Sequence, residues 1–376
     1  MFEALKQRLA GKASAAAPLV ALHMAGRPQW TPRNYAALAR EGFAANVIGY
    51  RCVRMVAEAA ASIPLMVFAD GAEVSDHPVK ALIARPNDGQ SGREFFESLY
   101  GFLLVAGNAY AEAVLIDGAP RELYVLRPDR MKIVPSRQGW PEAFDYSVNG
   151  THVRLARQQV LHVKLFNPLD DFYGQSPLEA AQRALDTHNA AAAWNKSMLD
   201  NAARPSGALV FTGGDGQLTQ EQFDRLKREL DANYQGAANA GRPMVLEGGL
   251  DWKEMGYSPR EMDFIAAKDG AAREVALAFG VPPMLLGIPG DNTFANYAEA
   301  NRTFWRQTVV PLTGRVLEAL AHWLAPPFGA VSIVPDLDQV EALAADRDGL
   351  WARLEKAGFL SDDEKREAVG YGPKVA

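Results

Sequence analysis

The chain has 376 residues, 48% of them hydrophobic and 22% charged, which is the composition of a globular protein with a sizeable core. Its 39 basic and 45 acidic residues give a net charge of −6, and this argues against tight, sequence-specific binding to DNA phosphates. Cys52 is the only cysteine, so no internal disulfide can form. No uninterrupted apolar run of about 18 residues predicts a membrane span.

The first 175 residues predict an α+β region preceded by a loosely ordered arm. Residues 1–29 have a faint signal-peptide character, but Glu3, Pro18 and His23 interrupt it, and an arm is the preferred interpretation. Predicted helices cover Ala36–Ala61 and Ser91–Gly107, the second with a Ser91/Glu94 capping box. Short strands are predicted at Ile63–Phe68, Ala109–Ile116, Glu122–Val125, Lys132–Pro135, Phe144–Val148 and Val160–Lys164. Asn149-Gly150 is the strongest hairpin signal.

Two long helices with a small insertion between them are predicted next. Ser176 begins the first, an alanine-rich helix to about Ala202 whose small residues allow another helix to approach closely. The insertion reads as β-α-β, with strands at Ala208–Phe211, Met244–Leu246 and Leu250–Lys253 and a helix at Thr219–Tyr234. A capping box at Ser258/Glu261 begins the second long helix, which Gly280 ends and Pro282-Pro283 prevent from continuing.

A Gly/Pro-broken loop, 286–292, joins this helix to another that starts near Thr293. Towards the C-terminus the sequence predicts a strand at Val331–Val334 and helices at Gln339–Ala357 and from Ser361. By shape alone, the two helices around the loop could form an ordinary αα-hairpin.

The sequence motifs in this region resemble those of the portal proteins of long-tailed bacteriophages. They are A-F-G-V-P-P-M-L-L-G at 278–287, N-Y-A-E-A at 296–300 and F-W-R-Q-T-V-V-P-L at 304–312. Further matching words lie at 82–97 (L-I-A-R-P-N-D-G-Q-S-G-R-E-F-F-E), 103–112, 173–181 and 241–252, so the resemblance covers nearly the whole chain. It implies an α+β subunit with a wing, long stem helices, a small αβ clip insertion and a helical C-terminal region, assembling into a ring.

The resemblance also implies boundaries along the chain. They are an N-terminal arm at 1–29, the wing at 30–175, the outer stem helix at 176–203, the clip at 204–256, the inner stem helix at 257–280, the tunnel loop and following helix at 281–323, and a C-terminal wing or crown region at 324–376. The chain is short for the family, which implies a reduced crown.

The function implied is that of the ring, usually of twelve copies, at one vertex of a phage-like head. Double-stranded DNA enters through it during packaging and leaves during ejection. The implied partners are the major capsid protein, the terminase large subunit docked on the clip, and the head-completion or tail adaptor protein that replaces it. Assembly would take place in the host bacterial cytoplasm, and the particle could be a phage, a prophage or a gene transfer agent.

The residues implied to form the DNA channel are those of the tunnel loop: Leu286, Gly287, Ile288, Pro289, Gly290, Asp291 and Asn292. We expect Ile288 to supply an apolar tip and Asp291 to repel phosphate at close range. The tip lacks strong basic residues, so any grip on DNA there should be weak.

No catalytic, cofactor-binding or metal-binding residues are predicted. There is no G-x-x-x-x-G-K-[ST] phosphate loop, and the six histidines show no metal-ligand spacing. Asp170-Asp171 and Asp362-Asp363 could be considered as metal-binding carboxylates. However, the first pair lies in a predicted loop, and the second lies in the first turn of a predicted helix, where the helix dipole favours acidic residues. Two alternatives remain: a DNA-processing enzyme, which the missing motifs disfavour, and a monomeric head adaptor or scaffolding protein.

Overall fold

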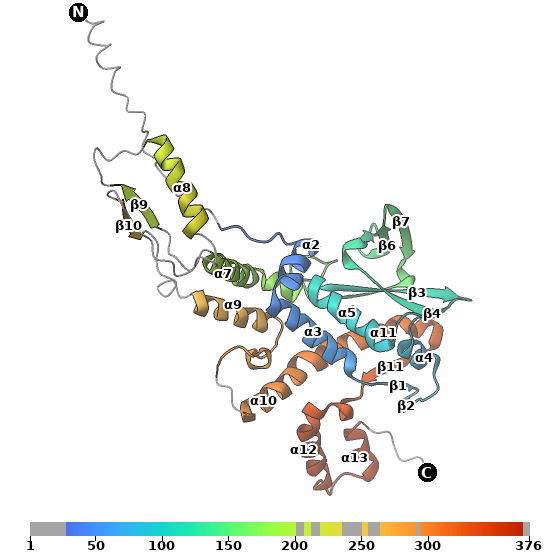
Figure 1. Ribbon diagram of the computed structural model, residues 1–376. Helices are drawn as coiled ribbons and strands as arrows, with labels where there is room; N and C mark the ends of the chain where they lie inside the picture. The colour runs from blue at the N-terminus through green and yellow to red at the C-terminus, as the bar shows by residue number, and fades with distance from the viewer. Residues whose placement is uncertain are drawn as a thin grey trace, which may run out of the picture. The chain divides into compact units, whose positions relative to one another are not determined.

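The computed structural model describes residues 28–200, 207–211, 219–234, 250–254, 264–290 and 294–370. The chain divides into two units, Met1–Trp30 and Thr31–Ala376. In the first unit only 28–30 are described, so the predicted arm otherwise lies outside the described residues. The second unit is a mixed α+β structure (Figure 1).

The first predicted helix, 36–61, is not continuous. It consists of α2 (Tyr35–Leu38), a π-helical turn η1 (Ala39–Ala44) and α3 (Val47–Ser62). The break falls at Asn46, whose buried side chain accepts hydrogen bonds from the amides of Ile48 and Gly49. The sequence shows an apolar face running through this position, but it does not show that Asn46 starts a new helix as its N-cap.

The next two helices pack tightly against each other and against a strand. They are α4 (Pro78–Ala84), which the sequence analysis missed, and α5 (Gly92–Ala106), where the predicted Ser91/Glu94 capping box is confirmed. A Cβ atom on Gly92 would lie 2.2 Å from the carbonyl oxygen of Ile83, so only glycine permits this approach. Asn87, between the helices, donates a hydrogen bond to the carbonyl of Leu123.

Nine of the described strands form three antiparallel sheets. They are β1 (Leu65–Ala69), β2 (Ala72–Glu73), β3 (Asn108–Ile116), β4 (Ala119–Leu126), β5 (Met131–Pro135), β6 (Pro141–Val148), β7 (Thr151–Ala156), β8 (Val160–Lys164) and β11 (Val331–Pro335). Their orders are β11-β1-β2, β4-β3-β8 and β5-β6-β7. Strand β7 was not predicted from the sequence, because its residues are mostly exposed and do not alternate between polar and apolar.

Three of the hairpins turn on the dipeptides Asp70-Gly71, Asp117-Gly118 and Asn149-Gly150. In each, both residues have positive φ angles, between 50° and 80°. This is the geometry of a two-residue type I′ turn, so the prediction of a hairpin at Asn149-Gly150 is confirmed.

The β4-β3-β8 sheet separates two hydrophobic cores. The larger core contains residues of α3, α5, α9 and α11, and α11 packs on both α3 and β11 (Figure 1). The smaller core lies between this sheet and β5-β6-β7 and includes Tyr110, Met131 and Phe144. Because side chains alternate along β3, Ala109 and Ala111 face the larger core and Tyr110 faces the smaller one.

The second half of the chain is mainly helical. The predicted helix at 176–202 is interrupted at Ala181, giving α6 (Pro177–Ala180) and α7 (Gln182–Asp200). The insertion shows β9 (Gly207–Phe211) paired antiparallel with β10 (Leu250–Glu254), and α8 (Gln220–Tyr234) with the predicted Thr219/Gln222 box. The strand at 244–246 and the Ser258 capping box lie outside the described residues.

The remaining helices are α9 (Phe264–Ala278), α10 (Phe294–Phe304), α11 (Val310–Phe328), α12 (Ala344–Glu355) and α13 (Asp362–Ala368). Helix α9 packs alongside α7 (Figure 1). Single turns of 3-10 helix precede α12, so it starts later than the predicted Gln339. The predicted Ser361/Glu364 box before α13 is confirmed.

Candidate functional site

The C-terminal end of α9 is fixed by a contact that only glycine allows. Gly280 has a φ angle of +64°, and its carbonyl accepts a 2.6 Å hydrogen bond from the hydroxyl of Thr308. A Cβ atom at Gly280 would lie only 2.6 Å from that hydroxyl oxygen. The A-F-G-V-P-P motif therefore determines where α9 ends and the predicted channel loop begins.

The first part of that loop is ordered against the rest of the chain. A 3-10 turn, η5 (Pro283–Leu286), leads to Gly287, and the amide of Ile288 donates to the carbonyl of Pro283. The guanidinium of Arg273 donates to the carbonyl of Pro289. The side chain of Ile288 is only 6% exposed, so the expectation that it forms an exposed apolar tip is wrong for the single chain. The hydrophobicity that suggested a tip reflects packing instead.

The exposed residues of the predicted loop that the structure describes are Gly287, Pro289 and Gly290. Asp291 and Asn292 lie outside the described residues. Leu286 is half-buried and packs against the larger core. The loop is therefore anchored through Ile288, whereas Pro289 and Gly290 are exposed, with the carbonyl of Pro289 held by Arg273.

The helix after the loop contains a π-helical turn, η6 (Trp305–Val309), between α10 and α11. Pro311 explains it, because proline has no N–H to donate and its ring clashes with the carbonyl four residues earlier. The amide of Val310 bonds instead to Trp305, and the fully buried hydroxyl of Thr313 donates to the carbonyl of Val309. The motif F-W-R-Q-T-V-V-P-L thus forms a widened helical turn. Thr308, which lies within this turn, donates the hydrogen bond that holds the end of α9.

Residues of two further motifs, 103–112 and 173–181, contact each other just before α6. Gly107 ends α5 with a φ angle of +71°, and the amide of Leu165 donates to its carbonyl. The Oδ1 of Asn108 accepts from the amide of Gly174 at 2.9 Å and from the ring of His162 at 3.0 Å. A Cβ atom on Gly174 would lie 2.1 Å from the carbonyl oxygen of Gly107. This junction fixes the direction in which the chain enters α6 and α7.

Burial moves the pKa values of two side chains in the hydrophobic interior well away from their ordinary range. Burial raises the pKa of the Cys52 thiol to about 12 and, with the positive charge of Lys164, lowers the pKa of His162 to about 4. His162 stacks on Tyr110, with ring centroids 4.4 Å apart. No group of three or more His, Cys, Asp or Glu side chains that could hold a metal ion occurs among the residues that the structure describes.

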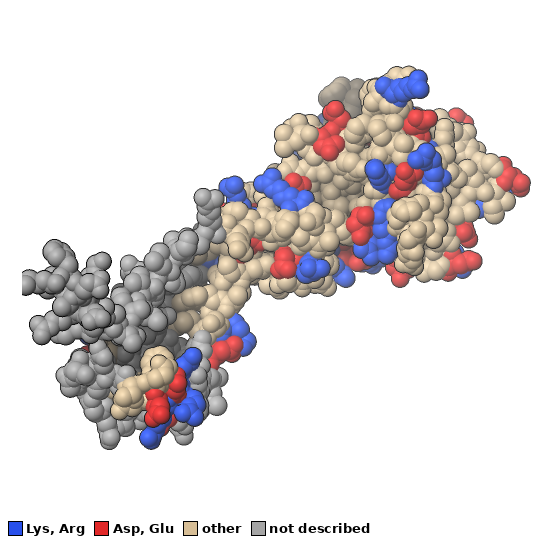
Figure 2. All heavy atoms as spheres, turned by 90° about the horizontal axis from the view of Figure 1, so that it is seen from above, with Lys and Arg blue, Asp and Glu red and all other residues tan. Residues whose placement is uncertain are grey.

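Charges of both signs are interspersed over the face of the described residues shown in Figure 2. Several are paired with each other, as Arg154 is with Asp145 and Lys196 with Asp200. Within the described part of the chain, no helix is long and apolar enough to cross a membrane.

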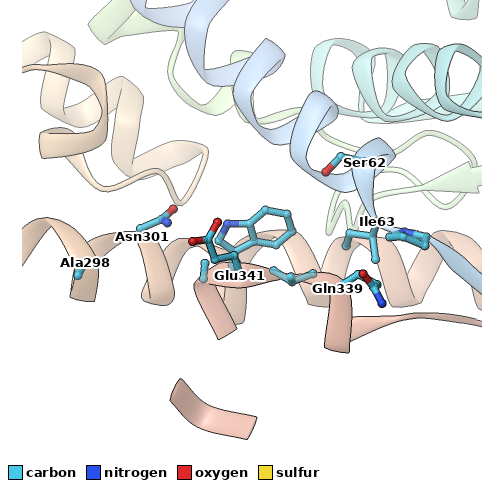
Figure 3. A pocket seen from close by; sticks show the side chains of 10 residues that line it. Ser62, Ile63, Ala298, Asn301, Gln339 and Glu341 are labelled. Carbon is cyan, nitrogen blue, oxygen red and sulfur yellow. The ribbon is translucent and has the colours of Figure 1, made fainter. Parts of the chain in front are cut away.

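A cavity of about 570 Å³ lies where the C-terminal segment meets α3 and α10. Figure 3 shows Ser62 and Ile63 from the end of α3, Ala298 and Asn301 from α10, and Gln339 and Glu341 from the C-terminal segment. The lining combines amide, hydroxyl and apolar groups with one carboxylate, which is not the arrangement of a nucleophile, a base and an oxyanion site.

The comparisons with known proteins agree with this architecture. Residues 48–370 match the phage portal protein family, so the chain belongs to that family, whose members are structural proteins rather than enzymes. A protein of Rickettsia felis is 40% identical over 343 residues, covering 89% of each chain, but carries no functional name. The portal protein of Enterobacteria phage HK97 is 24% identical and covers 86% of this chain and 78% of its own length.

Two solved structures are similar over a larger share of the chain. A chain in the neck of an empty gene transfer agent particle is 55% identical with a TM-score of 0.73, covering 93% of this chain and 96% of that one. A chain in the neck of a native gene transfer agent particle, computed with C12 symmetry, gives 55% and 0.70. An HK97-family portal protein from Corynebacterium diphtheriae, 18% identical with a TM-score of 0.61, supports the fold.

Proposed function

We propose that this chain is the portal subunit of a gene transfer agent-like particle, which forms the DNA channel at one vertex of the head and connects the head to the tail. The observation that carries the proposal is the 55% identity to chains in gene transfer agent necks over 93% of the sequence. Identity at that level over nearly the whole chain leaves little of the sequence free for a different role. The C12 symmetry of one of those necks supports a ring of twelve copies.

Within that ring we assign 30–175 to the wing, 176–203 and 257–280 to the stem helices, 204–256 to the clip and 281–323 to the tunnel loop and its following helix. The side-by-side packing of α7 and α9 supports the stem assignment, and the β9–β10 pairing between them supports a compact clip. The channel contact belongs to Gly290, Asp291 and Asn292, since the residues before them are held by η5 and Arg273.

The other proposed partners follow from the same assignment. The terminase large subunit docks on the clip during packaging, and the head-completion or tail adaptor protein replaces it there. The major capsid protein surrounds the ring, which assembles in the bacterial cytoplasm and remains in the particle. Double-stranded DNA passes without sequence-specific contacts, in keeping with the net charge of −6.

Imaging and mass measurement of the purified protein test this proposal. We expect rings with a central hole and a mass of about twelve subunits, alone or with the head proteins. A protein that stays monomeric at high concentration under both conditions would favour the adaptor or scaffolding alternative.

A deletion tests the clip assignment. Because Gly207 pairs with Glu254 at the base of the β9–β10 ladder, a short linker can replace 207–254 and still join α7 to α9. The shortened protein should keep the unfolding transition of the 31–200 region and lose binding to the terminase large subunit. Normal DNA packaging by this variant would contradict the assignment.

A further inference from the structure

The hydroxyl of Tyr110 is a buried polar group that the fold leaves without a partner. Tyr110 is only 1% exposed, and its Oη atom has no hydrogen-bond partner in the part of the chain that the structure describes. A buried hydroxyl that makes no hydrogen bond costs stability, and most such groups in folded proteins are bonded. The ring of Tyr110 stacks on His162 and meets Phe144 edge to face. Phenylalanine would make the same ring contacts, so packing does not explain the hydroxyl.

Tyr110 lies on the wall of a cavity of about 370 Å³ between α2, the start of β3 and the segment that leads into α6. Burial raises the pKa of Tyr110, and Tyr173 and Asp170 raise it further, so the hydroxyl is protonated and lies near both residues. Tyr173 and Asp170 also line the cavity. Its volume is within the range of sites for small molecules.

The charged side chains of the lining are Asp170, Glu179 and Arg33. The Oδ1 atom of Asp170 accepts hydrogen bonds from two backbone amides, at 2.7 and 3.0 Å, which leaves Oδ2 for another donor. The hydroxyl of Ser176 accepts from the amide of Glu179 at 2.9 Å, but the Glu179 carboxylate does not return to the Ser176 amide, so capping does not use it. Arg33 is exposed, and its Nε donates to the side chain of Gln182 at 3.3 Å. Two carboxylates and one guanidinium leave the lining with an excess of negative charge.

We propose that this cavity binds a small organic cation, an aliphatic diamine, whose ammonium groups donate to the hydroxyl of Tyr110 and to the carboxylates of Asp170 and Glu179. An ammonium group has donors and no acceptor, which suits a lining with free carboxylate oxygens. The methylene groups of the amine pack against the apolar part of the wall, which includes Leu38 and Val105.

Other classes of ligand suit the lining less well. An anion would meet the excess of negative charge. A divalent metal ion would find two carboxylates here, and no described group of three or more His, Cys, Asp or Glu side chains could hold one. A bound diamine would connect α2, β3 and α6, which are distant in sequence, and would stabilise the place where they meet. The cavity belongs to a single chain, so binding can be measured whether or not rings form.

Titration calorimetry of the full-length protein with 1,4-diaminobutane at low ionic strength tests the site. The wild type should show saturable binding of about one molecule per chain, and its melting temperature should rise with the concentration of the diamine. 1,4-Butanediol has the same carbon chain without the charges and should not bind. Absence of saturable binding by the diamine, or equal binding by the diol, would overturn the proposal.

Tyr110→Phe removes only the unpartnered hydroxyl. Without ligand, the melting temperature of this variant should be unchanged or higher, because a buried unsatisfied group is lost. The Kd for the diamine should rise about tenfold, as expected for the loss of a hydrogen bond to a charged group. A lower melting temperature without ligand would show that ordered water already satisfies the hydroxyl, and would overturn its assignment to a ligand.

Glu179→Gln provides a second variant, because it keeps the backbone bond to Ser176 and the size of the side chain but removes the charge. It should also raise the Kd about tenfold. The matched control is Tyr124→Phe, since Tyr124 lies on β4 outside the cavity and is 39% exposed, and this variant should bind like the wild type. Equal affinity of Tyr110→Phe, Glu179→Gln and the wild type would place the amine elsewhere on the protein and overturn the site.

Discussion

A single buried amide, that of Asn108, fixes the chain just before it enters α6 and α7. Its oxygen accepts from Gly174 and His162, and its NH2 group donates to the carbonyl of Ala106 at 3.0 Å. Buried polar groups are stable only when they are bonded in this way, so the loop before α6 cannot shift without leaving donors unpaired.

Gly174→Ala should therefore destabilise the protein. The new methyl group would lie 2.1 Å from the carbonyl oxygen of Gly107, a backbone atom that cannot rotate away. We expect the free energy of unfolding to fall by about 1–3 kcal/mol, which is typical of overpacking. Thermal unfolding measures this. Gly101→Ala in α5 is the matched control, because no described atom lies within 4 Å of its Cβ position, and it should be neutral or slightly stabilising.

His162 should make stability depend on pH. Burial lowers its pKa in the folded protein to about 4, below the unfolded value of about 6.5, so the unfolded chain binds the proton more readily between these values. The stabilisation is complete above pH 6.5 and is lost as the pH falls toward 4, by about 3 kcal/mol in all.

Unfolding in denaturant at pH 7.5 and pH 5 measures this effect. His162→Gln retains an amide that can donate to Asn108 but cannot titrate, so it should flatten the pH dependence in this range. An unchanged slope in the variant would mean that other groups account for it.

Ile288 shows what residue type alone could not decide. An isoleucine between glycines and a proline suggests an exposed apolar tip, whereas the chain folds back through η5 and buries the side chain. The backbone bond to Pro283 and the reach of Arg273 to Pro289 depend on tertiary placement, which no local pattern contains.

At the scale of elements, the features that depend on residues close together in the sequence were predicted correctly. The capping boxes at Ser91, Thr219 and Ser361, the Asn149-Gly150 hairpin and strands such as β3 and β8 are confirmed. The break before α3 was missed, because it depends in part on a partner that is distant in sequence. Asn46 is held by Asn189, with 2.8 Å between the two side chains.

Helix α12 is held to α10 and η6 by ion pairs, and the apolar residues Val340 and Leu343 just before it belong to the larger core. Neither α12 nor α13 has a buried residue. Asp346 lies between Arg302, with Nη1–Oδ1 at 3.6 Å, and Arg306, with Nε–Oδ2 at 3.7 Å. The cavity shown in Figure 3 lies where the segment before α12 meets α3 and α10, so the packing there is incomplete.

Asp346→Asn should thus loosen α12 while leaving the larger core intact. We expect faster amide hydrogen exchange in 344–368 and a loss of under about 1 kcal/mol, because these ion pairs are partly exposed and screened by salt. The wild type in high salt should exchange like the variant. Unchanged protection in both cases would show that other contacts hold these helices.

At the scale of the whole molecule, DNA contact should be confined to the end of the predicted loop. A photoreactive group at Asn292 should cross-link to DNA in filled particles and lose the signal after ejection, whereas one at the buried Ile288 should not reach DNA. Asp291→Lys should slow ejection and make it dependent on salt, because a ring of cations attracts phosphates. Equal labelling from Ile288 and Asn292 would contradict this account.

The pairing of β1 with β11 has a consequence for biosynthesis. Leu65 lies opposite Pro335, and β11 also packs against α11, so a sheet begun near the start of the chain is closed by a strand close to its end. At 5–20 residues per second, a ribosome needs on the order of 15–50 s to reach β11 after making β1. During that time β1 has only the two-residue β2 to pair with, and its open edge is exposed to other nascent chains. Translation speed and chaperone supply should therefore limit the yield of assembly-competent subunits more than the folding of any single helix does.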